Sequence, residues 1–431
     1  MESVPAIAAK KITVRIVPWL IICLTMAYID RTNLAFAQFS LAKSFGIDPL
    51  VFGTAAGVFF AGYIAAEIPS NLLLLRFGAR RWLARIMISW GVVTMSTYFV
   101  HTDTQLYIVR FLLGVCEAGF YPGVLFYLTR FIPIENRART NFLFISAIPL
   151  SAVIGSIFSG WLLETISKSH YLGMAAWQWL FLTEGLMTIF IGIALLFVLP
   201  ESIKSVKYLS DAEKLQLSAH IQAQEETKAV IGSPLKALLD LKVWIYAIVT
   251  SASAFSMYCI SFWLPQIIKS FNVTNTLHIG FINAIPWGLA LVALASSFLM
   301  IGTIKRPIFV LSLLYGIGCL SLSAILINGI SVTTKLGLIS VATTAIMLTY
   351  PVFWSLVNFL KGKAAAVIFA VINSIGSLAG FMSPIMMGYV IKATGSPQLG
   401  IVIMSGFMGL AVILLFVIHI AFTENQRAAA F

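Results

Sequence analysis

Long apolar runs, separated by short polar connections, follow one another along almost the whole chain. A helix needs about 20 apolar residues to cross the hydrocarbon core of a bilayer. Twelve runs of about that length lie near 14–38, 51–75, 83–101, 105–130, 140–163, 177–199, 243–268, 278–301, 307–327, 336–360, 364–391 and 399–422. The pattern predicts an all-α integral membrane protein with twelve transmembrane helices.

One long polar segment, from about Glu201 to Leu241, divides six of these runs from the other six. Within it, Ser210 followed by Glu213 has the spacing of a capping box, which predicts a surface helix. Beyond the segment the pattern restarts at an offset of roughly 225 residues. We therefore expect two six-helix bundles, residues 1–200 and 242–431, joined by a cytoplasmic linker over 201–241.

The composition agrees with a membrane protein, because 60% of the residues are hydrophobic and only 10% are charged. A soluble globular domain carries about a quarter charged residues, so that class is excluded. If the N-terminus is cytoplasmic, 21 of the 28 Lys and Arg residues fall in cytoplasmic segments and five in outer loops. This bias follows the positive-inside rule. The net charge of +12 therefore indicates topology rather than nucleic-acid binding, and we expect both termini in the cytoplasm and a plasma membrane location, the inner membrane in a bacterium.

Four charged residues lie inside the predicted spans at similar depth: Asp30 and Arg31 in the first, Arg110 and Glu117 in the fourth. An ionised side chain at the centre of a span costs about 2.5 to 3.5 kcal/mol on insertion scales. The helical rise places Asp30 and Arg110 at one level, and seven residues return Glu117 to the face of Arg110. One interpretation is that the four residues only neutralise one another between helices. We favour a functional site near the middle of the membrane.

The chemistry of these groups suits a proton-coupled carrier of organic anions. Two guanidinium groups can hold a carboxylate by paired hydrogen bonds, and a partly buried carboxyl group can bind and release a proton near neutral pH. We therefore assign proton coupling to Asp30 and Glu117. Candidate substrate ligands are Arg31, Arg110 and Tyr28 in the first half, and Tyr258, Trp354 and Asn373 in the second.

Two further features of the spans bear on this site. Gly119 and Gly123 form a GxxxG pair that lets another helix approach closely, and Pro122 is expected to bend the fourth span one turn below Glu117. Glu184 lies seven residues from the outer end of the sixth span, and we interpret it as structural.

Several stretches resemble the major facilitator superfamily and, within it, the anion:cation symporter family. They read YIDRTNLAFA from Tyr28, GYIAAEIPSNLLL from Gly62, RFGARRWLARIMISWG from Arg76, YIVRFLLGVCEAGFYPG from Tyr107 and WQWLFLTEGL from Trp177. The second half is similar at PVFW from Pro351 and AVINSIGSLAGFMSP from Ala370.

The resemblance implies the major facilitator fold and proton symport of carboxylates such as sugar acids, tartrate-like acids or aromatic acids by alternating access. It also implies that Asn373 and Trp354 contact the substrate. It assigns gating to the loop between the second and third spans, with Arg76, Gly78, Arg80 and Arg81. Two departures from the family pattern are Leu75, where an Asp usually precedes the Arg, and IGTIKRP, which lacks the acid and most of the bases expected between the eighth and ninth spans.

Other functions are less well supported by the sequence. An organic-phosphate exchanger would need a base in the seventh span facing Arg31, and 243–263 contains none. A transport-inactive sensor would need a docking surface, for which only the linker is long enough. A membrane enzyme is not expected, because no nucleophile–base pair or metal-ligand cluster occurs in the spans. We expect no cofactor and no metal, and a monomer whose partners are a small organic anion, protons and the lipid bilayer.

Overall fold

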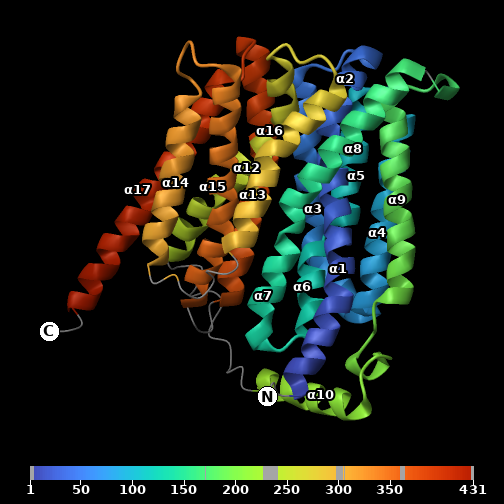
Figure 1. The fold of residues 1–431 in the computed structure, drawn as a ribbon, viewed down its shortest axis with the longest axis vertical. Helices are drawn as coiled ribbons and strands as arrows, with labels where there is room; N and C mark the ends of the chain where they lie inside the picture. The colour runs from blue at the N-terminus through green and yellow to red at the C-terminus, as the bar shows by residue number, and fades with distance from the viewer. Residues whose placement is uncertain are drawn as a thin grey trace. The chain divides into compact units, whose positions relative to one another are not determined.

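The computed structural model describes residues 4–169, 171–226, 241–297, 304, 306–359 and 365–428, and within these ranges the regular structure is helical throughout. Figure 1 shows the arrangement. The first half contains α1 (Val4–Thr32), α2 (Leu34–Phe45), α3 (Pro49–Phe77), α4 (Ala79–Ser96), η1 (Thr97–Phe99), α5 (Asp103–Glu117), α6 (Phe120–Thr129), α7 (Ile134–Ile145), α8 (Ala147–Ser169), η2 (Tyr171–Gly173) and α9 (Ala176–Val198). The rest contains η3 (Ile203–Ser205), α10 (Asp211–Glu226), α12 (Leu241–Lys269), α13 (Thr276–Ser297), α14 (Pro307–Ala324), α15 (Val332–Phe359), α16 (Ala365–Thr394) and α17 (Gln398–Ala428).

Eleven helical segments of the described chain are long and apolar enough to cross a membrane. The expectation of an all-α integral membrane protein is therefore confirmed. The span expected at 83–101 corresponds to α4 and η1, which are not among the eleven. Three arginines, Arg80, Arg81 and Arg85, occupy the first two turns of α4 and lower its apolar character.

The chain forms two compact units. Unit 1 comprises Met1–Gly46 and Val58–Ala229, and unit 2 comprises Ile47–Gly57 and Val230–Phe431. The helix α3 thus begins in unit 2 and continues in unit 1. Within unit 1, α4 packs along α9 and α1 packs against α8; within unit 2, α12 packs along α16, and α14 packs against α15 and α17.

The helix predicted within the polar linker is present as α10. The main-chain N–H of Ser210 donates to Oε2 of Glu213 at 2.8 Å, and the N–H of Glu213 donates to Oγ of Ser210 at 3.3 Å. This reciprocal pair is the capping box. Figure 1 shows α10 beside the N-terminal end of α1. There Lys11 lies 2.6 Å from the Glu213 carboxylate and lowers its pKa.

Three of the predicted spans are interrupted within the described chain, one of them, 140–163, at Ser146 between α7 and α8. The run expected at 14–38 is divided at Asn33 into α1 and α2, and the run expected at 105–130 is divided after Glu117 into α5 and α6. At the break after Glu117, Gly119 has φ +83°, a left-handed conformation that favours glycine. The expectation that Pro122 bends the helix below Glu117 is therefore wrong in position. Pro122 lies in the first turn of α6, where main-chain N–H groups have no acceptor within the helix. The N–H that proline lacks therefore costs α6 no hydrogen bond.

Glycines let α3 and α5 cross in direct backbone contact. A Cβ atom added at Gly114 would collide with the carbonyl oxygen of Phe59, and one added at Gly62 would collide with that of Phe111. In a membrane, where the apolar tails of lipids compete for helix surfaces, such close packing is a main source of helix association. The crossing therefore fixes α5 against α3 inside unit 1.

The same helix also passes close to the GxxxG pair. A Cβ at Gly119 would meet the Ser70 side chain, and one at Gly123 would meet Leu74. Both Ser70 and Leu74 belong to α3. The close approach of a second helix to this face, expected from the sequence, is confirmed.

Gly114→Ala is expected to lower the stability of the purified protein by about 1 to 3 kcal/mol or more, because the new methyl group must displace the α3 backbone. Thermal unfolding in detergent measures this loss. The matched control is Gly316→Ala on α14, where an added Cβ meets nothing within 4 Å. Equal unfolding temperatures for the two variants would contradict the role of the α3–α5 crossing.

Candidate functional site

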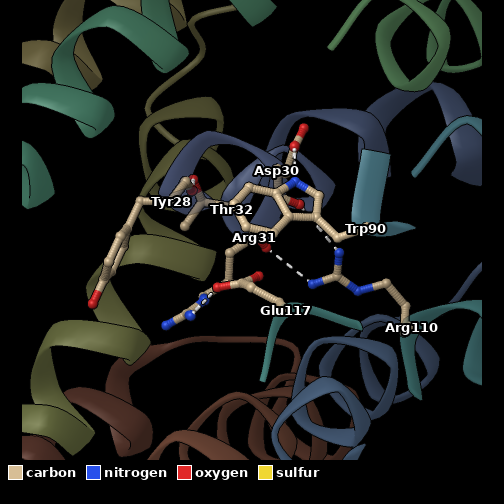
Figure 2. A network of polar contacts seen from close by, with 7 residues as sticks. All are labelled: Tyr28, Asp30, Arg31, Thr32, Trp90, Arg110 and Glu117. Atoms are coloured by element: carbon tan, nitrogen blue, oxygen red, sulfur yellow. Dashed lines mark hydrogen bonds and ion pairs between the residues drawn. The ribbon is translucent and has the colours of Figure 1, made fainter. Parts of the chain in front are cut away.

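The four charged residues predicted to lie together in the membrane are all buried in unit 1. Asp30 and Arg31 lie in the last turn of α1, two residues and one residue before its end at Thr32, and Arg110 and Glu117 lie on α5. Their exposed fractions are 0%, 7%, 1% and 2%, respectively. Figure 2 shows Arg31 and Glu117 pointing toward each other, Arg110 pointing toward the main chain of α1, and Asp30 pointing toward Trp90.

Arg31 and Glu117 form a buried ion pair. Nη2 of Arg31 donates to Oε1 of Glu117, while Oε2 of Glu117 has no hydrogen-bond partner among the described residues. Aromatic rings surround the guanidinium group, with the ring centroids of Tyr28 and Phe59 at 4.7 and 4.9 Å from its central carbon. Ring faces attract cations, most strongly where water is excluded. The base is thus held by one carboxylate and by neutral rings.

Arg110 is held in a different way. Its Nη2 donates to the main-chain oxygen of Arg31 at 2.9 Å, and its Nη1 reaches that of Asp30 at 3.4 Å. Carbonyl groups in the last turn of a helix lack an intrahelical partner and carry partial negative charge. Arg110 therefore caps the interrupted end of α1. This contact also places Arg110 at the level of Asp30.

Asp30 and Arg31 are consecutive residues whose side chains point apart, as Figure 2 shows. Oδ2 of Asp30 accepts hydrogen bonds from Nε1 of Trp90 at 2.8 Å and from Oγ1 of Thr188 at 2.6 Å. Both donors are neutral, and within the described chain the Asp30 carboxyl makes no ion pair. The idea that the four charges only neutralise one another therefore fits Arg31 and Glu117 but not Asp30.

Three buried side chains around Asp30 were not among the predicted site residues: Trp90 on α4, and Thr188 and Glu184 on α9. Trp90 and Thr188 are uncharged residues in apolar runs, so the sequence gives no signal for them. Glu184 had such a signal, a charge within a span, but we interpreted it as structural. It is fully buried and accepts hydrogen bonds from Nδ2 of Asn33 at 2.8 Å and from Oγ of Ser159 at 3.0 Å.

The candidate ligands of the second half belong to unit 2. Tyr258 on α12 is 8% exposed, and its ring stacks on Phe262 with a centroid distance of 6.4 Å. Asn373 lies on α16 with an exposed side chain. Trp354 falls within α15, but its side chain lies outside the described residues. The binding roles of these three residues stay predictions.

The predicted gate segment lies between α3 and α4. Gly78 has φ +84°, a conformation that favours glycine, and Nη2 of Arg80 lies 3.3 Å from Oε2 of Glu201. Arg76 lies over the Phe77 ring at 5.7 Å, and Arg81 is exposed. In the corresponding loop of the second half, residues 301–303 and 305 lie outside the described residues. The gating role of the first segment stays a prediction.

Comparison of the whole chain with known proteins matches it to a protein family. A model of the Major Facilitator Superfamily matches residues 20–384. The chain is 39% identical over 405 residues to the "Putative metabolite transport protein NicT" of Pseudomonas putida, covering 92% of this chain and 91% of that protein. It is 38% identical over 426 residues to a "Putative tartrate transporter" of Agrobacterium vitis, covering 98% and 96%. In fold it is similar to a bacterial homologue of the human lysosomal transporter Spinster, crystallised in an inward-facing and occupied conformation, with TM-score 0.71, 15% identity and coverage of 95% and 97%.

Arg110→Lys is expected to destabilise the protein, because a single ammonium group cannot reproduce the planar fork that reaches two carbonyl groups. Hydrogen bonds from a charged group contribute about 1.5 to 3 kcal/mol each, and loss of one should be evident in thermal unfolding of the purified protein. Arg130→Lys, an exposed position just after α6, serves as the control. An unfolding temperature for Arg110→Lys equal to that of the control would show that the cap does not support α1.

Proposed function

The chain belongs to the major facilitator superfamily of secondary transporters, and from that premise we propose that it carries an organic carboxylate together with protons by alternating access. We place it in the anion:cation symporter family. The named tartrate relative supports a carboxylate substrate, and we propose the same broad class here: sugar acids, tartrate-like acids or aromatic acids. The distribution of Lys and Arg supports a bacterial inner membrane location with both termini cytoplasmic.

The buried pair of Arg31 with Glu117 is the observation that carries this proposal. Charges that leave water for a protein interior are tolerated when they are paired, and removal of one partner is strongly unfavourable. A substrate carboxylate that binds Arg31 therefore displaces Glu117 as its counter-charge. Glu117 then lacks a cation, which favours its protonated form. Anion binding and proton binding thus support each other.

The net charge of the Arg31–Glu117 pair is the same with and without bound substrate. Without substrate, the Arg31–Glu117 pair consists of one guanidinium and one carboxylate. With substrate, it consists of the same guanidinium, the substrate carboxylate and a neutral Glu117. The pair has no net charge in either state, so neither state places an uncompensated charge in the low-dielectric interior of the membrane. The coupling is reciprocal, because a free energy that links two ligands acts equally on both. A solute with one negative charge therefore enters with one proton at Glu117.

We assign the remaining roles on the same basis. Asp30 is a second proton site, Arg110 and Tyr28 complete the anion site beside Arg31, and the second half contributes Tyr258, Trp354 and Asn373. Arg76, Gly78, Arg80 and Arg81 form a gate, and the functional halves are residues 1–200 and 242–431, joined by 201–241. The transporter acts as a monomer on a small organic anion.

Glu117→Gln is expected to abolish accumulation of substrate driven by a pH gradient while leaving exchange, because the amide keeps the shape of the side chain but cannot take up a proton. Proteoliposomes with an acidic exterior and radiolabelled tartrate, gluconate or mandelate measure accumulation. Counterflow without a gradient measures exchange. Glu164→Gln on α8, where Glu164 pairs with Lys168 at 2.9 Å, is the matched control and should behave as the unmodified protein. Concentrative uptake by Glu117→Gln would overturn the assignment.

A further inference from the structure

A second pair of buried carboxyl groups lies between α1 and α9, apart from the ion pair. The end of α1 contributes Asp30, and the break directly after this helix contributes Asn33. On α9, Glu184 and Thr188 are one turn apart. Thr188 donates to Asp30 at 2.6 Å, and Asn33 donates to Glu184 at 2.8 Å. The two helices are thus joined by two crossed acid–donor bonds.

The side chains that donate hydrogen bonds to Glu184 within the described chain are neutral: Asn33 and, from α8, Ser159. The next residue of α9, Gly185, packs against Gly91 and Met95 of α4. Near the start of α9, Trp177 donates to Ser44 of α2 and Gln178 donates to the carbonyl of Tyr98 in η1. These contacts lie about two turns from Glu184. Among the described residues, the charged group that acts on the Glu184 carboxyl is the carboxyl of Asp30 on α1.

Asp30 in turn experiences the charges of Glu117 and Arg110, but its hydrogen bonds come only from Trp90 and Thr188. Its second oxygen, Oδ1, and Oδ1 of Asn33 have no hydrogen-bond partner among the described residues, although Asp30 and Asn33 are only 0% and 2% exposed. A protonated carboxyl group is itself a donor. This polar cluster therefore has acceptor capacity that added protons can satisfy.

Two interacting carboxyl groups in a buried site share their protons as a unit, because ionisation of one opposes ionisation of the other. Neither acid of this pair makes an ion pair within the described chain. We propose that Asp30 and Glu184 form a proton-holding pair, and that Glu184 takes part in carrying a proton that accompanies the substrate in addition to the proton on Glu117. This inference rests on the proposed function of the site.

Proton transfer through the pair makes and breaks one O–H bond. The bond forms when the pair accepts a proton from water on one side of the membrane. The same bond breaks when the proton passes to water on the other side. The Arg31–Glu117 exchange moves a monocarboxylate with one proton and no net charge, whereas a further proton on the pair adds one positive charge. Transport of a monocarboxylate is therefore expected to respond to membrane potential, and Glu184 is needed for that response.

Glu184→Gln tests this directly. Its oxygen can still accept from Ser159, and Asn33 can turn its amide so that the unpartnered Oδ1 accepts from the new NH₂ group. In proteoliposomes with gluconate as the probe, we expect about one fewer proton per substrate and loss of stimulation by an inside-negative potential, because an amide has no exchangeable acid proton. Uptake driven by a pH gradient persists. Glu184→Asp should restore the extra proton, and Glu164→Gln should leave the ratio unchanged.

The possible outcomes separate the two proposals. If unmodified protein moves gluconate, tartrate and mandelate without protons, the proposed function and this inference both fail. If it couples protons and Glu184→Gln keeps the full proton ratio and the response to potential, only the role of Glu184 fails. Slower uptake at an unchanged proton ratio would also assign Glu184 a structural role and overturn the inference.

A second pair of variants on α8 covers the case in which Glu184→Gln does not fold. Ser159→Ala removes a donor from Glu184, whereas Ser156→Ala removes an equally buried hydroxyl that bonds the main chain of its own helix at 2.6 Å. We expect the pH dependence of gluconate uptake to be displaced in the first variant only. Identical pH profiles in both variants would contradict a proton on Glu184.

Discussion

The cost of charge in a membrane interior is the constraint on which the polar centre of this protein depends. A buried ion pair is tolerated when its remaining hydrogen-bonding groups are satisfied, and the two bases meet this condition differently. Arg31 pairs with Glu117 among aromatic rings, whereas Arg110 donates to main-chain oxygens at the end of α1. As a result the Glu117 carboxylate pairs with Arg31 and main-chain oxygens hold Arg110, whereas the Asp30 side chain bonds to neutral donors.

The interruptions of the helices make this arrangement possible. If α1 continued without a break past Asn33, the carbonyl groups of Asp30 and Arg31 would accept from the amides of the next turn, and Arg110 would have less to bind. The break also turns Asn33 toward Glu184 on α9. On α5, the helix ends at Glu117 itself, and the left-handed Gly119 begins the next segment. Discontinuous helices near the middle of the membrane are common where transporters bind their ligands.

The sequence predicts the level and the face of the charged residues because both follow from the fixed rise and rotation of an α-helix. It does not predict their partners. These depend on the end of α1, and neither Gly nor Pro marks that break at Asn33. It also does not predict Trp90 and Thr188, because an uncharged donor in an apolar run resembles a packing residue. Glu184 is a different case: counting from the end of its span indicates a marginal position, whereas the packing of α9 against α1, α4 and α8 buries it completely.

The side chains of the consecutive residues Asp30 and Arg31 point apart and so separate two kinds of acid. One is Glu117, which pairs with Arg31, and the other is the pair of Asp30 and Glu184. In the proposed mechanism, Glu117 gives up its base to the incoming anion and takes up a proton that travels with the substrate, so the two together add no net charge. The proposed pair of Asp30 and Glu184 has no ion-pair partner within the described chain, so we expect its protonation to depend on the two acids together and on access to water rather than on direct competition with the anion. A carrier built in this way can keep its substrate site neutral while a second group of protons responds to membrane potential. The hydrogen bonds between α1 and α9 supply the geometry that this division requires.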